Sequence, residues 1–224
     1  MTQTVSPVRS GPLRGDETPD APASPARTQA ERRAASERKL LLAAAELIAE
    51  GGVAAATFER IGERAGYSRG LVSQRFGSKD GLIAALVKEL TAAFDARLAA
   101  EHFDELPPHE ALVAFVDVYF GSLWQAPVEN LYHVLLAESL ASQPALRPIF
   151  AGVHEAVGQR LRGLIERAQA AGTMPADLDA DAAALSVGGF LLGMTIQTMV
   201  DPQTDIERVR RHAVSSMRVA LRIG

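Results

Sequence analysis

The sequence of 224 residues contains no cysteine. Disulfides, thiolate zinc sites, cysteine nucleophiles and redox pairs are therefore excluded, and nothing in the composition marks an oxidising compartment. The apolar content of 47% is nevertheless ample for a hydrophobic core. We expect a folded, water-soluble, cytoplasmic protein.

The first 29 residues lack the apolar run that a signal peptide requires. They are rich in proline, and their arginines, Arg9, Arg14 and Arg27, are balanced by acidic residues. A segment of this composition buries too little apolar surface to fold. Residues 1–29 are therefore predicted to be a disordered leader.

The net charge of −4 argues against a nucleic-acid partner, but the charge is unevenly distributed. Residues 30–90 carry ten basic and eight acidic side chains, whereas residues 91–224 carry ten basic and sixteen acidic ones. A site for a polyanion is therefore expected in the first of these regions.

No segment shows the alternating pattern of a β-strand between hairpin turns, whereas apolar residues recur at helical spacing almost throughout. The sequence predicts an all-α fold of about nine helices. Thr28 and Glu31 form a capping box at the first helix start, and Gly51-Gly52 ends that helix. Shorter helices are expected to begin at Thr57 and Ser68, and a longer one at Ser78.

The remaining helices are punctuated by proline and glycine. Pro107-Pro108 interrupts the pattern and separates a small N-terminal part from a larger C-terminal part. Beyond it, helices are expected over about 109–124, 127–141, 145–171 and 179–200. The last begins at Thr204, where Glu207 completes a second capping box.

The segment from Thr57 to Leu82 is the most informative. Its two short helices are joined by Gly66-Tyr67-Ser68 and must pack on the rest of the domain to be stable. Gly62 permits a close helix crossing, and Gly66 suits a left-handed turn. The residues predicted to point inward are Ile61, Ala65, Val72 and Phe76. This pattern is typical of a helix-turn-helix, whose second helix enters the DNA major groove.

The second short helix has the surface chemistry that DNA contact requires, because no carboxylate lies between Glu63 and Asp80. Gln74 suits adenine, Arg69 suits guanine, and Leu71 suits a thymine methyl group. Helix N-termini present free N–H groups to phosphate. The predicted DNA-contacting residues are Thr57, Ser68, Arg69, Gly70, Leu71, Ser73, Gln74, Arg75 and Lys79. The alternative is a solvated helix face without a partner.

This segment resembles the N-terminal domain of TetR-family transcriptional regulators. The matching residues are Ile61-Gly62-Glu63-Arg64-Ala65-Gly66-Tyr67-Ser68, then Gly70, then Phe76-Gly77-Ser78-Lys79-Asp80-Gly81-Leu82. The family usually has tyrosine at the position of Ser73 and histidine or tyrosine at that of Arg75. Because Ser73 has a shorter reach, Arg75 and Lys79 are expected to anchor phosphate.

The resemblance implies a homodimeric repressor on a near-palindromic DNA operator, released when a small molecule enters the C-terminal domain. It implies a helix-turn-helix domain over 30–77 and an effector-binding and dimerisation domain over 78–224. The alternatives are a regulator of the same fold that takes no small ligand or activates transcription, and a helical small-molecule carrier or enzyme.

The C-terminal half carries aromatic and polar residues suited to a largely apolar effector. The candidate effector residues are Phe115, Tyr119, Trp124, Tyr132, His133, His154, Phe190, Met194 and Gln197, each of which also suits plain core. The candidate dimer-interface residues are Leu185, Gly189, Leu192, Ile196, Met199, Val209, Ala213 and Met217. They lie on the last two predicted helices, which would form a four-helix interface with a second copy.

No charged residue occurs from Ala182 to Val200, which raises a membrane span as an alternative. The glycines and polar residues in this segment favour a helix buried on two faces, and no membrane partner is expected. Asp177, Asp179 and Asp181 resemble the start of a calcium loop, but Gly188 stands where the loop needs glutamate. Neither catalytic motifs nor metal or cofactor sites are found, so an enzyme is not expected.

Overall fold

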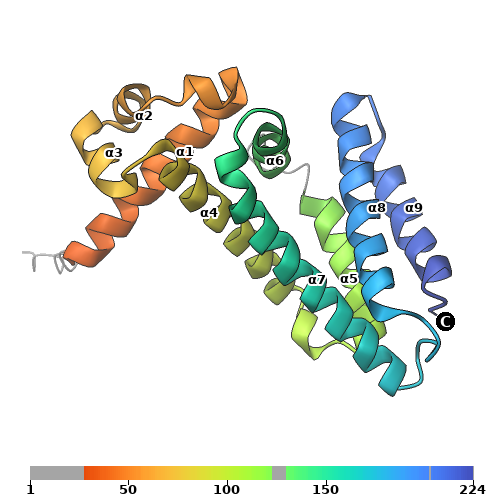
Figure 1. The fold of residues 1–224 in the computed structure, drawn as a ribbon. Coiled ribbons are helices and arrows are strands. Elements are labelled where there is room, and N and C mark those ends of the chain that lie inside the picture. Colours follow the sequence, from red (N-terminus) through yellow and green to blue (C-terminus); the bar gives the residue numbers. More distant parts are fainter. Residues whose placement is uncertain (1–27, 123–129, 202, 224) are drawn as a thin grey trace, which may run out of the picture.

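The structure, a computed structural model, describes residues 28–122, 130–201 and 203–223. These residues form nine α-helices and two short 3-10 helices and contain no strand, which confirms the predicted all-α fold (Figure 1). The helices are α1 (Gln29–Ala55), α2 (Phe58–Ala65), α3 (Arg69–Phe76), α4 (Lys79–Ala100), α5 (Pro108–Ser122), α6 (Leu131–Ala141), α7 (Arg147–Ala170), α8 (Ala180–Val200) and α9 (Ile206–Ala220). The 3-10 helices are η1 (Phe103–Glu105) and η2 (Pro144–Leu146).

Side-chain caps fix where the first four helices begin. Thr28 and Glu31 form the predicted capping box, with the Thr28 N–H donating to the Glu31 carboxylate at 2.7 Å. The hydroxyls of Thr57, Ser68 and Ser78 accept from backbone N–H groups three residues later. These predicted starts are confirmed, because a cap is a local interaction that the sequence specifies directly.

Two predicted boundaries differ from the structure. Helix α1 is broken at Gly51 and Gly52, as predicted, but resumes for a last turn to Ala55. Helix α9 is capped by Asp205, whose carboxylate accepts from the Arg208 N–H at 3.0 Å, so the predicted box starting at Thr204 is wrong. An aspartate cap also places a negative charge at the positive end of the helix. The start predicted at 127 lies outside the described residues.

The core has two parts. The first joins α1, α2, α3 and the start of α4 to α6 and the start of α7, with Leu40, Val72 and Leu135 fully buried. The second lies among the end of α4 and helices α5, α7, α8 and α9. Helices α4 and α7 run side by side and extend from the first part of the core to the second (Figure 1). Helix α6 therefore packs with the N-terminal helices although it lies late in the sequence.

Candidate DNA-binding surface and effector region

Helices α2 and α3 form a helix-turn-helix whose crossing depends on two glycines. Gly66 ends α2 in the left-handed conformation at φ 76°, as predicted. A Cβ atom at Gly62 would lie 2.8 Å from the carbonyl oxygen of Tyr67, in the turn itself. The Tyr67 N–H donates to the Gly62 carbonyl at 2.8 Å, so any side chain at Gly62 would push the turn away.

The inner face of this motif is buried as predicted. Ile61 and Val72 have no exposed surface, and Phe76 is buried beside them. Ala65 is half-buried against the same core. Arg64 donates to both carboxylate oxygens of Glu50 on α1, and this ion pair fastens α2 to α1. Helix α3 is therefore held by its inner face, and the opposite face is left open.

The open face of α3 carries the residues predicted to contact DNA. Ser68, Arg69, Gly70, Ser73 and Gln74 are exposed. Thr57 is also exposed, whereas Leu71, Arg75 and Lys79 are half-buried. The helix carries hydrogen-bond donors and no carboxylate, and it lies at one end of the molecule (Figure 1). This geometry suits insertion into a major groove with a phosphate strand on either side.

A second group of predicted residues meets where α5, α6 and α8 come together. The Tyr119 hydroxyl lies 2.8 Å from Nε2 of His133. The same Tyr119 oxygen accepts a hydrogen bond from the Thr195 hydroxyl at 3.2 Å. Burial raises the pKa of Tyr119 to about 12 and lowers that of His133 to about 4, so both groups are neutral near pH 7. Thr195 was missed by the sequence analysis, because only the fold brings it to residues so distant in the chain.

Tyr132 extends this group towards α7. Its ring stacks on that of His154, with centroids 6.3 Å apart, and meets Phe150 edge-on at 5.4 Å. Burial raises the pKa of Tyr132 and lowers that of His154. The Tyr132 hydroxyl and Nδ1 of His133 are buried without a hydrogen-bond partner among the described residues. Each such atom costs about 1–3 kcal/mol unless a partner reaches it.

The other candidate effector residues are distributed differently. Phe115 is buried in the second core beside Phe94, in a packing position. Phe190 and Met194 are half-buried on α8, whereas Gln197 is exposed. Trp124 lies outside the described residues. The structure therefore brings together Tyr119, Tyr132, His133 and His154, but not the whole predicted set.

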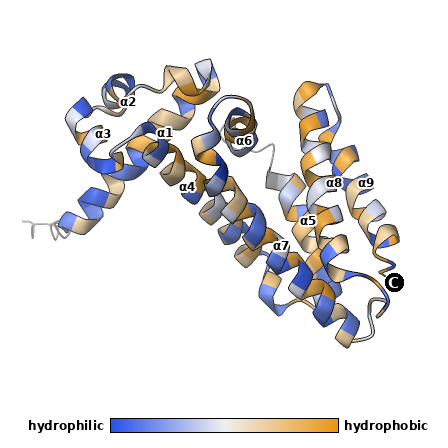
Figure 2. Cartoon of the chain, in the orientation of Figure 1, coloured by the Kyte–Doolittle hydropathy of each residue, from blue (hydrophilic) through white to orange (hydrophobic). Residues whose placement is uncertain are grey.

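The candidate dimer residues divide between an open and a closed face. Leu185 on α8 is 79% exposed, Ile196 and Gly189 are exposed, and Leu192 and Met199 are half-buried. On α9, Val209 is half-buried. Figure 2 shows hydrophobic residues along much of α8. By length and composition α8 is also the one described helix that passes as a membrane span, although a third of its most apolar stretch is buried in the chain.

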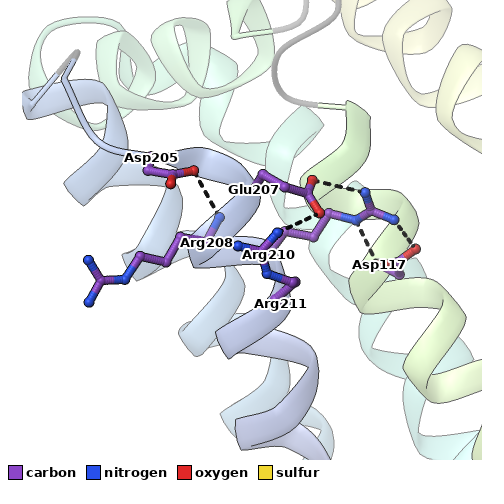
Figure 3. A network of polar contacts seen from close by, with 6 residues as sticks. All are labelled: Asp117, Asp205, Glu207, Arg208, Arg210 and Arg211. Carbon is purple, nitrogen blue, oxygen red and sulfur yellow. Dashed lines mark hydrogen bonds and ion pairs between the residues drawn. The ribbon is translucent and has the colours of Figure 1, made fainter.

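Ala213 and Met217 do not lie on an open face, which corrects the placement predicted for them. Ala213 has no exposed surface and Met217 is 7% exposed, because both pack in the chain's own second core. In this orientation of α9, Arg210 donates to both carboxylate oxygens of Asp117 on α5, each at 2.7 Å (Figure 3). Glu207 accepts a further bond from Arg210 at 3.1 Å.

Comparison with known families agrees with this geometry. Residues 40–86 match the model of bacterial regulatory proteins of the tetR family, and residues 108–220 match that of the BetI-type transcriptional repressor C-terminal domain. The HTH-type transcriptional regulator BetI of Ectopseudomonas mendocina is 32% identical over 112 residues, which are 49% of this chain and 57% of that protein. BetI 1 of Chromohalobacter salexigens is 34% identical over 84 residues, 37% of this chain and 42% of the relative. The chain thus aligns with about half the length of these curated relatives.

Solved structures show the same architecture over most of the chain. The complex of SmeT with triclosan superposes with a TM-score of 0.73 at 27% identity, covering 83% of this chain and 91% of SmeT. SmeT is the repressor of a multidrug efflux pump of Stenotrophomonas maltophilia. A TetR-family regulator from Rhodococcus superposes at 0.71 with 21% identity, covering 84% of this chain and 99% of that one. With its helix-turn-helix at one end and a BetI-type C-terminal domain at the other, the chain belongs to the TetR family of transcriptional regulators.

Proposed function

We propose that this regulator represses transcription as a homodimer on a near-palindromic operator and leaves it when a small molecule binds near Tyr119, Tyr132 and His133. The observation that carries the proposal is the open face of α3, which is rich in donors, free of carboxylate and held from behind by a buried inner face. Neither a small-molecule carrier nor an enzyme requires a helix face with these properties.

Dimerisation is supported by the open apolar face of α8. Leu185 and Ile196 are exposed here, and so is Val200 at the end of the helix, which is costly for apolar residues of a free chain. Pairing α8 and α9 with the same helices of a second copy removes that surface from water. The two α3 helices must then lie about 34–36 Å apart to read successive major grooves.

Effector binding is supported by the unpaired atoms of Tyr132 and His133. A largely apolar compound with one hydrogen-bonding group would satisfy these atoms while its body packs on the rings of Phe150 and His154. SmeT has been solved with triclosan, and a relative from Saccharomonospora viridis with choline. These compounds are ligands of those proteins, and the effector of this chain remains to be identified by the experiment below.

Release is supported by the position of α6. Tyr132 and His133 belong to the effector region, and Leu131, Leu135 and Leu136 of the same helix belong to the core of the helix-turn-helix domain, against which Tyr132 also packs. An effector that shifts α6 therefore shifts residues packed against α1 and α4. Binding weakens DNA affinity by as much as the effector prefers the shifted arrangement.

The test of DNA binding is fluorescence anisotropy with the DNA upstream of the chain's own gene, measured over a range of salt concentrations. Arg75→Ala and Lys79→Ala are each expected to lower the slope of log affinity against log salt by about one, since each removes a phosphate contact. Gln74→Ala should mainly change sequence preference. Lys88→Ala, exposed further along α4, is the matched control and should leave the slope unchanged.

The effector arm uses the same DNA with a panel of apolar compounds that begins with triclosan. A compound that releases wild-type protein should release Tyr132→Phe less readily, while DNA affinity without the compound stays the same. Absence of specific DNA binding by the wild type would refute the repressor proposal, and release of Tyr132→Phe at unchanged concentration would refute the effector site.

A further inference from the structure

A groove between the outer end of α1 and helix α3 is not explained by the DNA contacts described above. Along α1, Leu40, Ala44 and Leu47 form the buried apolar stripe. One and two turns earlier, the same face carries Arg32, Arg33 and Ser36, which line the groove. The face that builds the core thus becomes basic where the helix extends beyond the core, and Figure 2 shows hydrophilic residues at this end of α1.

The lining of the groove is positively charged. Four of its residues are basic, namely Arg32, Arg33, Lys39 and Arg75, and none is acidic. Arg33, Lys39 and Arg75 form no ion pair with any described residue. Nε of Arg75 is buried and lacks a hydrogen-bond partner in the described part of the chain. Arg33, Lys39 and Arg75 share one groove whose lining holds no carboxylate, so they repel one another and an anionic occupant stabilises them.

The groove is also continuous with the reading face of α3. Leu71, Gln74 and Arg75 line it, and all three belong to the surface predicted to contact DNA. A duplex whose major groove holds α3 therefore carries one of its two phosphate strands alongside Arg75 and towards α1. The phosphate strand is the one occupant that brings a row of regularly spaced negative charges to this position.

We propose that the outer end of α1 binds the sugar-phosphate backbone of the operator, with Arg33 and Lys39 as phosphate contacts beside Arg75. This inference rests on the proposed DNA-binding function and extends it to residues ahead of the family match, which begins at residue 40. The contact adds affinity and fixes the register of α3 without reading bases.

The expected effect follows from counterion release. Each lost phosphate contact lowers the salt slope by about 0.9, which corresponds to about fivefold in affinity at 0.15 M salt. Arg33→Ala/Lys39→Ala should therefore lower the slope by about two and weaken binding about thirtyfold. The loss should be equal for operator and scrambled DNA, and the hydroxyl-radical footprint should lose protected positions at the outer edges of the site.

The matched control is Arg38→Ala/Lys88→Ala, which removes the same charge from exposed positions that do not line the groove. It should retain nearly the wild-type slope and footprint, and Arg33→Lys/Lys39→Arg should do the same. Equal losses in the groove and control variants would overturn the inference, as would an unchanged slope in Arg33→Ala/Lys39→Ala. Failure of the wild type to bind DNA would instead contradict the proposed function itself.

Discussion

Replacing Gly62 with alanine tests whether the helix-turn-helix depends on direct contact between α2 and the turn. A Cβ atom at this position would lie 2.8 Å from the Tyr67 carbonyl oxygen and 3.1 Å from both the Arg69 nitrogen and the Ser68 carbonyl carbon. All three neighbours are backbone atoms, so no side-chain rotation relieves the contact. The turn and the start of α3 must move outward.

Two opposing terms set the size of the effect. Alanine inside a helix is favoured over glycine by about 1 kcal/mol. Overpacking against a rigid neighbour costs about 1–3 kcal/mol. We therefore expect Gly62→Ala to lose up to about 2 kcal/mol of stability, which for a chain of this size lowers Tm by up to about 8 °C.

The control is the same substitution at Gly152 on α7, where a Cβ atom would meet nothing within 4 Å. There only the helix-propensity term remains, so Gly152→Ala should raise Tm by about 2–4 °C. Both variants are measured by circular dichroism at one protein concentration. Equal rises in Tm for Gly62→Ala and Gly152→Ala would refute the close-contact reasoning.

Three further predictions concern the C-terminal half. His133 has a pKa of about 4 in the folded chain and about 6.5 in the unfolded chain. Between pH 6.5 and pH 4 the unfolded chain therefore binds the proton that the folded chain does not, and the free energy of unfolding falls as the pH drops through this range. Urea unfolding should show that the free energy of unfolding is about 2 kcal/mol lower at pH 5 than at pH 7, and that His133→Gln lacks this difference. If the variant shows the same difference as the wild type, a group other than His133 causes it. Leu185→Lys should yield monomers in sedimentation velocity while Leu140→Lys, on exposed α6 surface, should not; a dimeric Leu185→Lys would exclude this face. A double-mutant cycle on Asp117 and Arg210 should give a coupling energy of about 1 kcal/mol that decreases in high salt, since both side chains are partly exposed. A coupling energy of zero at low salt would show that the ion pair does not stabilise the packing of α9 on α5.

The parts of the fold that the sequence predicted correctly are those fixed by neighbouring residues. The caps at Thr57, Ser68 and Ser78 each need only a hydroxyl and a backbone N–H three residues away. Gly66 was assigned its left-handed conformation because the turn admits few other residues. The open face of α3 followed from the absence of carboxylates, which any solvated helix of this length would normally include.

The parts that were missed depend on how the helices rotate and pack. The apolar stripe of α9 was assigned to a partner subunit, but Ala213 and Met217 pack inside the chain's own second core, on the side of α9 that α5 covers. Periodicity gives the width of such a stripe and not the surface that covers it. Thr195 lies 76 residues from Tyr119, so no spacing rule joins them.

Helix α6 shows why such tertiary facts matter for function. In sequence it belongs to the C-terminal half, yet its leucines complete the core of the DNA-binding end, and Tyr132 and His133 of the same helix carry unpaired atoms. Close-packed cores are not continuously deformable, so a shift of α6 is passed to α1 and α4 or is not made at all. We expect an effector that satisfies the two unpaired atoms to act on the helix that packs against α4, and through α4 on the position of α3. Coupling between the two ends of the molecule then needs no relay longer than one helix.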